Sequence, residues 1–464
     1  MSVRCEQIVI RRGHPAYAGC AYVTQVARRI KNATHYLIRH RKKPDGKAVS
    51  HRDADKLLKS ENPELYGKVP SAVAQRCTRI AGQEWKGFYA ALKDWGKSPG
   101  KYKAKPNPPK YSYKASTCHI GRNGFRVDAG TLVFADSVIA PIKTRFKFSQ
   151  NWNEKKGQNV AQEIRVVPKG ACFVLEMVYD SALLCTDGQF STLFDQQKHL
   201  GIDLGINNLM AVVSNQQELK PVLINGKPLK SVNAWYNRRA AKLASTGNWK
   251  HLKAVAFKRQ CRIVDALHRA SHFVRSYCQT HDIGLVVIGH NQGWKQDVNL
   301  GRVNNQKFVY IPHSVLINQI KYKCEAAGIA VVVNEESYTS KASALDNDSM
   351  PTKHAKPKPG ENVESSEKKT VEEKPKFSGK RVKRGLYKTQ WGAINADVNA
   401  AANILRKVTG DAFGPACRGA VFSPVTITLG SHPRTATRRG LGKQNCVLPN
   451  QVLEAKPIPI PELV

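Results

Sequence analysis

Apolar segments after Lys198 follow an order that narrows the choice of folds. Three β-prone runs come first, a stretch of helical spacing follows, and a strand, a helix and another strand complete the series. The runs are Leu200–Leu204, Met210–Val213, Val222–Ile224, the helical stretch Ile263–Tyr277, Leu285–Ile288, Ser314–Ala327 and Ile329–Val333. A meander of three strands followed by helix, strand, helix and strand is the order of an RNase H-like fold, although other α/β domains share part of it.

Two aspartates stand at the ends of elements that are far apart in this region. Asp203 ends the first strand and is followed by Gly205, while Asp397 begins a helix with an apolar face. A turn aspartate and an aspartate that complements the helix dipole are the ordinary explanations for each residue alone. Together they suggest carboxylates that hold two hard cations about 4 Å apart, one activating water and one stabilising the leaving oxygen of a phosphodiester.

The charge balance indicates a polyanionic partner. Lys and Arg total 74 against 35 Asp and Glu, for a formal net charge of +39 in 464 residues. Each phosphate that such a protein neutralises releases counterions, so we expect nucleic acid; ribosomal proteins, polymerase-type enzymes and membrane-surface proteins share this charge. There is no run of about 18 apolar residues and no apolar signal core, so we expect a cytoplasmic protein without a membrane partner.

The cysteine pattern argues against a structural zinc site. Eleven cysteines are scattered along the chain, and no two of them form a Cys-x-x-Cys pair. Structural zinc usually needs such pairs, because two thiolates on one turn reach a single tetrahedral ion. We therefore expect no zinc.

The part of the chain before Lys198 divides into a helical and a β-rich region. Apolar residues recur at helical spacing after a predicted helix start at Pro70-Ser71, and a basic, proline-containing segment follows from Lys101 to Lys110. Residues from about 115 to 185 contain short β-prone runs separated by Gly, Asp or Asn turns. This pattern is typical of a small antiparallel barrel or sandwich.

Four segments resemble motifs of the TnpB family, the RNA-guided nucleases that bacterial insertion sequences encode and that are related to the type V CRISPR effectors. They look like the three RuvC motifs and the segment that precedes the third. The segments are Gly201–Leu209, Leu285–Ile288, Tyr338–Lys341 and Asn395–Ile404. The resemblance covers Lys198 to Val408 well and extends more loosely to Pro70–Gln75 and Lys101–Lys110.

The resemblance implies a multidomain α/β protein. A helical recognition module would be inserted near the start of a β-barrel wedge domain, and an RNase H-like RuvC nuclease domain would follow. The implied boundaries are 1–20 and 110–195 for the wedge, 21–109 for the recognition module, 196–348 and 377–410 for the nuclease, 349–376 for a flexible linker, and 411–464 for a largely disordered basic tail. The resemblance also implies two Mg²⁺ ions as cofactor, guide RNA and target DNA as partners, and a place at the nucleoid of the bacterial cytoplasm.

The sequence departs from the family at the end of one strand. The family usually has a catalytic glutamate after the strand that corresponds to Leu285–Ile288, and this chain has Gly289 there, as a dead nuclease would. Glu335 and Glu336 follow the neighbouring strand, so a carboxylate could reach the same metal ions from there, as in TnpB branches with a relocated glutamate. Glu336 is the preferred catalytic residue and Glu335 the second candidate; two solvated glutamates after a strand are the alternative.

A second departure is the missing zinc ribbon. Where the family commonly has cysteine pairs after Thr339-Ser340, this chain has Asp346 and Asp348, followed by the linker. These aspartates could bind a metal, although solvation in a loop is their ordinary role.

Basic residues complete the predicted site. A positive cluster beside a cleavage site stabilises the scissile strand, and basic residues interleaved with aromatics are typical of surfaces that bind phosphates and stack bases; solvated loops have the same composition. The candidate nucleic-acid-binding residues are Lys101, Lys103, Lys105, Lys110, Lys295, Lys307, Arg381, Lys383 and Arg384.

The sequence therefore predicts a Mg²⁺-dependent, RNA-guided DNA endonuclease with Asp203, Glu336 and Asp397 as metal ligands. One rival hypothesis is an RNA-guided DNA-binding protein without nuclease activity, acting as a repressor or a transposition accessory. Another is a DNA-joining transposase. The flanking DNA motif, the length of the guide RNA and the oligomeric state do not follow from the sequence.

Overall fold

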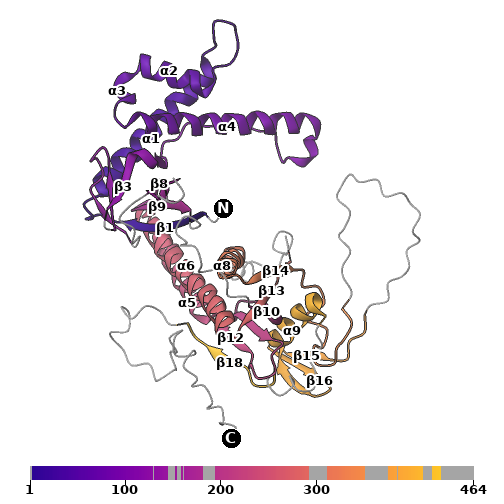
Figure 1. Ribbon diagram of the computed structural model, residues 1–464. Helices are drawn as coiled ribbons and strands as arrows, with labels where there is room; N and C mark the ends of the chain where they lie inside the picture. Colours follow the sequence, from indigo (N-terminus) through magenta and orange to yellow (C-terminus); the bar gives the residue numbers. More distant parts are fainter. Residues whose placement is uncertain are drawn as a thin grey trace. The chain divides into compact units, whose positions relative to one another are not determined.

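The computed structural model describes residues 3–128, 130–144, 152–153, 158–159, 161–180, 194–291, 311–350, 375–383, 385–410 and 421–429. It divides into two compact units (Figure 1), which are described one at a time. Unit 1 comprises Met1–Gln189 and Trp249–Ala254, and unit 2 comprises Phe190–Asn248 and Val255–Val464. Three predicted binding residues and most of the predicted linker and tail lie outside the described residues: Lys295, Lys307, Arg384, 349–376 and 411–464.

The strands of unit 1 form antiparallel sheets. The larger sheet has the order β1 (Val3–Ile10), β9 (Phe173–Asp180), β8 (Ala161–Pro168) and β2 (Cys118–Gly121). The smaller sheets are β3 (Phe125–Asp128), β4 (Thr131–Phe134) and β5 (Ile142–Lys143), and the pair β6 (Trp152–Asn153) and β7 (Gln158–Asn159). These strands confirm the β-rich region, while its closure into a barrel stays a prediction.

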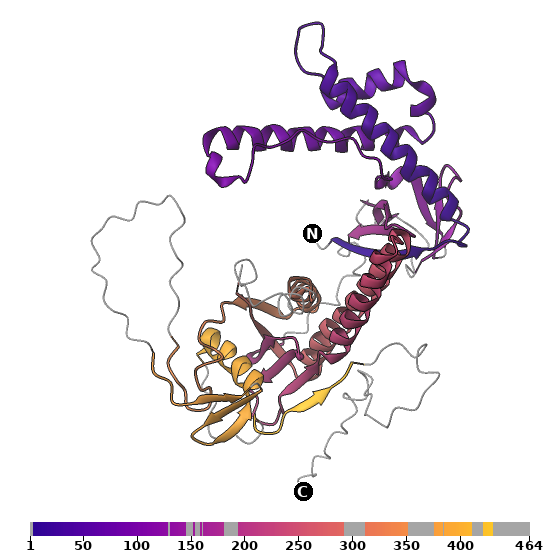
Figure 2. The ribbon, with the colours of Figure 1, turned by 180° about the vertical axis from the view of Figure 1, so that it is seen from behind.

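The helices of unit 1 are α1 (Tyr17–His40), α2 (His51–Glu61), α3 (Pro63–Tyr66) and α4 (Ser71–Lys97), with short 3-10 turns η1 (Pro99–Lys101) and η2 (Arg122–Gly124). A capping box between Ser50 and Asp53 starts α2, because each side chain bonds the backbone N–H of the other. The start of α4 directly after Pro70 confirms the prediction. Figure 2 shows α4 extending well beyond its crossing with α1.

Helices and strands of unit 1 share one hydrophobic core. Ile30 of α1, Cys77 of α4, Ile164 of β8 and Leu175 of β9 belong to the same buried cluster. Because burial of apolar surface is the main favourable term in folding, the helical and β-rich regions stabilise each other.

Unit 2 is built on a mixed sheet of six strands. Their order is β14 (Ala330–Asn334), β13 (Ile283–Gly289), β10 (Asp195–Leu204), β11 (Asn208–Ser214), β12 (Val222–Asn225) and β18 (Val425–Ile427). β10, β11 and β12 form an antiparallel meander, whereas β13 and β14 run parallel to β10. The five strands predicted after Lys198 are thus confirmed. The sequence did not indicate β18, which pairs with β12 from within the predicted basic tail.

Helices pack against both faces of this sheet (Figure 1). On one face, residues of α6 (Trp249–Thr280) and α8 (His313–Glu325) form a buried cluster with Ile202 and Ile288, and α5 (Lys227–Ser245) adds Leu229. On the other face, α9 (Ala396–Thr409) packs against Val213 and Val287. Successive strand residues point to opposite faces, which explains why neighbours such as Val287 and Ile288 belong to different clusters.

A small antiparallel sheet leads directly into α9. It consists of β15 (Lys380–Lys383), β16 (Leu386–Thr389) and β17 (Gly392–Asn395). Asn395 is the N-cap of α9, because its side chain accepts hydrogen bonds from the N–H groups of Asp397 and Val398.

Within the described residues, none of the helices is both long and apolar enough to cross a membrane.

Candidate active site

The carboxyl ends of three parallel strands bring the predicted motifs together. Asp203 is the last residue but one of β10, Gly289 ends β13, and Glu336 follows two residues after β14. Ile202 pairs with Ile288, so Asp203 and Gly289 lie level at this edge of the sheet. Open α/β sheets bind their ligands at the carboxyl ends of parallel strands, which makes this edge the place to look for chemistry.

Asp203 carries a carboxyl group whose proton affinity is strongly perturbed. Part of its surface is accessible, yet burial and then the negative charges of Glu336 and Asp397 raise its pKa to about 8, against an opposing effect of Arg381. Like charges shift a pKa in this way only when they lie near one another. Glu336 and Asp397 therefore lie near enough for their charges to act on Asp203.

Asp397 is held in the first turn of α9 by two asparagines. Its N–H donates to Asn395 Oδ1 over 2.9 Å, and Asn208 Nδ2 donates to Asp397 Oδ2 over 2.8 Å. Asn208 begins β11 after a tight turn at Gly205, where a Cβ would lie 2.5 Å from the Asn208 carbonyl oxygen. The turn that follows Asp203 thus carries the side chain that orients Asp397.

Glu336 is held by Asn291, which lies two residues after β13. Asn291 Nδ2 donates to Glu336 Oε1 over 3.3 Å, and the Glu336 N–H donates to Asn291 Oδ1 over 3.1 Å. Burial raises the pKa of Glu336 and the charge of Glu335 raises it further, while Lys407 acts in the opposite direction. Glu336 is therefore fixed through both its backbone and its carboxylate.

Glu335 has a different environment from its neighbour. Its carboxylate lies 2.6 Å from Lys407 Nζ and accepts a hydrogen bond from Ser337, and the Lys407 side chain is only 7% exposed. Burial acts to raise the pKa of Glu335, but the hydrogen bonds from Lys407 and Ser337 outweigh it and lower the pKa. This ion pair favours Glu336 over Glu335 as the metal ligand.

The donor set suits a hard divalent cation. Asp203, Glu336 and Asp397 offer only carboxylate oxygens, which Mg²⁺ and Mn²⁺ prefer. Among the described residues, no three His, Cys, Asp or Glu side chains already form a group of metal ligands, so these carboxylates would have to turn toward a shared ion. The raised pKa of Asp203 fits a cation at this place, because a positive charge would offset the burial and the like charges that cause it.

Asp346 and Asp348, where the family commonly has a zinc ribbon, are engaged in hydrogen bonds. The hydroxyls of Ser343 and Ser378 donate to Asp346 Oδ2 over 2.6 and 3.0 Å. The N–H groups of the same two serines donate to Asp348 Oδ2 over 2.7 and 3.1 Å. These four residues form a clasp that joins the chain on the two sides of residues 349–377.

Two buried asparagines of α9 also support the site, and the sequence analysis missed them. Asn399 Nδ2 donates to the Ala342 carbonyl over 2.8 Å, and Asn403 Nδ2 donates to the Thr339 carbonyl over 2.9 Å. They tie α9 to the loop that follows Glu336. Their spacing of four residues, on the helix that carries Asp397 in its first turn, was the available signal.

The predicted basic residues lie in different parts of the chain. Arg381 and Lys383 are exposed on β15, and Arg381 is near enough to Asp203 to lower its pKa. Four others are exposed in the segment after α4 in unit 1: Lys101, Lys103, Lys105 and Lys110. Of the predicted basic residues that the structure describes, Arg381 is the one whose charge acts on Asp203.

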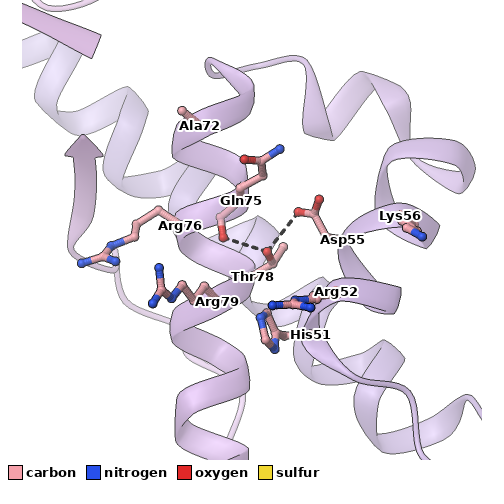
Figure 3. A pocket seen from close by; sticks show the side chains of 9 residues that line it. All are labelled: His51, Arg52, Asp55, Lys56, Ala72, Gln75, Arg76, Thr78 and Arg79. Atoms are coloured by element: carbon pink, nitrogen blue, oxygen red, sulfur yellow. Dashed lines mark hydrogen bonds between the residues drawn. The ribbon is translucent and has the colours of Figure 1, made fainter. Parts of the chain in front are cut away.

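A basic pocket between α2 and α4 in unit 1 was not predicted (Figure 3). Its volume is about 660 Å³, and its lining is His51, Arg52, Asp55, Lys56, Ala72, Gln75, Arg76, Thr78 and Arg79. The spacing of Arg52 and Lys56 and of Arg76 and Arg79 places each pair on one helix face, which was the signal in the sequence.

The cations of this pocket are poorly neutralised by its own lining. Asp55 accepts hydrogen bonds from the Thr78 hydroxyl over 3.0 Å, as Figure 3 shows, and from the hydroxyl of Tyr66. Within the described residues, Arg52, Lys56 and Arg79 form no ion pair. A surface of this kind attracts phosphate groups.

The comparison with protein families bears on unit 2. Residues 186–295 match the family OrfB_IS605, described as probable transposase. The matched residues include β10 and β13, and the match confirms the resemblance to TnpB for this part of the chain. The comparison with curated proteins gave no match.

Several solved structures are similar to the chain at low identity. One is a Cas12f1–sgRNA–target DNA complex, at 15% identity and a TM-score of 0.32, covering 87% of this chain and 99% of that one. A CRISPR-Cas12f ternary complex has 14% identity and a TM-score of 0.28, and the match covers 70% of this chain and 72% of that one. C2c1 of Alicyclobacillus acidoterrestris in complex with single-guide RNA has 9% identity and a TM-score of 0.30, and the match covers 84% of this chain and 65% of that one. At these values the likeness alone establishes no function.

Proposed function

We propose that the protein is an RNA-guided, Mg²⁺-dependent DNA endonuclease of the TnpB type, with an RNase H-like nuclease domain in unit 2. The observation that carries the proposal is the placement of the three carboxylates: Asp203 lies level with Gly289 at one edge of the sheet, Glu336 lies against Gly289, and Asn208 of β11 holds Asp397. In agreement with this, burial and the charges of Glu336 and Asp397 raise the pKa of Asp203. Groups perturbed in this way cluster at functional sites. The meander β10, β11 and β12, extended by the parallel strands β13 and β14, supports the RNase H-like architecture.

The proposed site divides its tasks among several side chains. Asp203, Glu336 and Asp397 would hold two Mg²⁺ ions, which would supply an activated water and stabilise the leaving oxygen. Asn208 orients the carboxylate of Asp397, and Asn291 orients that of Glu336. Because the site is partly buried, these charges and dipoles act more strongly than they would in water.

The proposed partners are a guide RNA and a target DNA that pairs with it. In such a system base pairing selects the sequence, while the protein contacts the phosphate backbone. The net charge of +39 and the basic pocket of unit 1 supply positive charge for those contacts. Arg381 would place a cation beside the scissile phosphate.

Cleavage of a plasmid library by the purified ribonucleoprotein tests this proposal. The library carries a guide-matched target beside randomised flanking sequence, and the variants are Asp203→Asn, Asp397→Asn and Glu336→Gln. We expect Mg²⁺-dependent cleavage by the wild type and a loss of at least about 100-fold in each variant, with guided binding retained. Glu335→Gln is the matched control, because its carboxylate pairs with Lys407, and it should keep most of the activity.

Other outcomes favour the rival hypotheses. Stable guided binding by a wild-type protein that does not cut would favour the repressor or transposition accessory. Strand transfer between DNA ends would favour the DNA-joining transposase. Sequencing of the RNA that copurifies with the protein is the companion measurement, and absence of any specific RNA would contradict guidance altogether.

A further inference from the structure

The end of β13 has room for a side chain that comes from elsewhere. A Cβ built on Gly289 would lie 2.4 Å from Ile404 Cδ1 and 3.2 Å from Glu336 Oε2. A side chain at position 289 would therefore collide with α9 and crowd the Glu336 carboxylate. The absence of a side chain at Gly289 is a condition for the present position of Glu336.

The residues after Gly289 continue the contact between the two strands. The His290 N–H donates to the Asn334 carbonyl over 2.8 Å, which extends the pairing of β13 with β14 by one residue. Asn291 follows and makes the two hydrogen bonds to Glu336, one to its carboxylate and one from its backbone N–H. An amide side chain carries a donor and an acceptor on two separate atoms and adds no charge, so it can make both of these bonds at once.

The neighbouring glutamate is held apart from this arrangement. Glu335 is bound by Lys407 and Ser337, so its carboxylate does not compete for Asn291 in the structure. The charged groups that act on Glu336 are Glu335 and Lys407, and Glu336 in turn acts on Asp203. Adjacent glutamates thus have separate partners.

We infer that Asn291 is a positioning residue: it fixes the carboxylate of Glu336 at the end of β13, in the space that Gly289 leaves open. The inference rests on the proposed function, because it assigns to Glu336 a role as metal ligand. Fixing a glutamate side chain costs conformational entropy, and the hydrogen bond from Asn291 to the carboxylate offsets this cost before a metal ion binds. Side chains that orient metal ligands in this way typically change metal affinity by about 10 to 100-fold when they are removed.

A double-mutant cycle tests the inference. Mn²⁺ affinity is measured by electron paramagnetic resonance on the full ribonucleoprotein carrying Asn291→Ala, Glu336→Gln or both, beside the wild type. We expect Asn291→Ala to weaken Mn²⁺ binding about tenfold and to raise by a similar factor the Mg²⁺ concentration that gives half-maximal cleavage. In the Glu336→Gln background, Asn291→Ala should have no further effect. Asn237→Ala on α5 is the control and should leave both quantities unchanged.

Two more variants keep the inference open to refutation if Asn291→Ala unfolds. Asn291→Ser keeps a small polar side chain at this position. Gly289→Ala should weaken Mn²⁺ binding, because its methyl group would displace the Glu336 carboxylate. Melting followed by circular dichroism shows which variants are folded. Wild-type Mn²⁺ affinity in folded Asn291→Ala or Asn291→Ser would overturn the inference and leave the proposed function standing. Absence of Mn²⁺ binding by the wild type would instead overturn the proposed function, and the inference with it.

Discussion

Asn208 and Asp397 stand 189 positions apart in the sequence and are joined by a hydrogen bond of 2.8 Å between amide and carboxylate. The bond links the start of β11 to the first turn of α9. It fixes the Oδ2 oxygen of Asp397. The packing of α9 on the sheet is thereby coupled to the geometry of the carboxylates.

Replacing Asn208 should impair cleavage without affecting guided binding. We expect Asn208→Ala to lower kcat/KM about tenfold, because Asp397 loses its orienting donor, and Asn208→Asp to lower it further, because it adds a like charge. Single-turnover cleavage with saturating guide RNA measures the effect. Asn207→Ala is the control, because the Asn207 side chain accepts a hydrogen bond from Lys230 Nζ. A comparable loss of activity in Asn207→Ala would argue against a specific role for Asn208.

The raised pKa of Asp203 predicts a stability gain on its removal. The folded state keeps the proton of Asp203 up to about pH 8, whereas the unfolded chain releases it near 3.8, so stability falls as the pH rises between these values. Asp203→Asn removes this loss, which we put at about 2 kcal/mol at pH 8 after allowance for partial exposure. Calorimetry in the presence of a chelator should show a higher melting temperature for the variant at pH 8 and little difference at pH 4.

Glu335 should respond to pH in the opposite direction. Its pKa is lowered in the folded state, so its pairing with Lys407 stabilises the protein above the pKa of the unfolded chain and is lost as the pH falls through the folded value. At pH 7 the free energy of unfolding of Glu335→Gln should therefore be about 1 kcal/mol lower than that of the wild type, with a lower melting temperature. In strong acid the two proteins should melt at the same temperature. An unchanged melting temperature at pH 7 would show that the ion pair contributes no net stability.

Divalent cations should bind more tightly as the pH rises. A cation competes with the proton that Asp203 holds up to about pH 8, so Mn²⁺ affinity should increase by up to about tenfold per pH unit between pH 6 and 7 and level off above pH 8. Titration of the ribonucleoprotein with Mn²⁺ at several pH values measures this. Affinity that does not change with pH would place the cation away from Asp203.

The basic pocket of unit 1 should contribute to nucleic-acid binding. Arg52→Ala combined with Arg79→Ala removes two exposed cations from its lining, so affinity for nucleic acid should fall. In a plot of log affinity against log salt concentration, the slope should become smaller in magnitude by about 2. Fluorescence anisotropy with guide RNA and with DNA duplex, each measured separately, identifies the ligand. Lys59 of α2 lies outside the lining, so Lys59→Ala is the control and should have a smaller effect.

Local patterns predicted much of unit 2. The strands are short apolar runs with helices between them. The two aspartates lie near the end of a strand and in the first turn of a helix, so their positions could be predicted from the sequence. The roles of Asn208 and Asn291 could not, because each depends on a partner that the fold brings close. The choice between Glu335 and Glu336 also depends on how the chain leaves β14, since neighbouring side chains point in different directions there. β18 is three residues long and has too little pattern to predict.

The clasp between Asp348 and Ser378 has a practical consequence for engineering. Because hydrogen bonds join these two residues, the chain leaves unit 2 after Asp348 and re-enters it at Ser378 at nearly the same place. Another folded module whose own ends lie close together could be grafted between them, so that a reporter or a second enzyme would be carried by the protein while β17 and α9 kept their register.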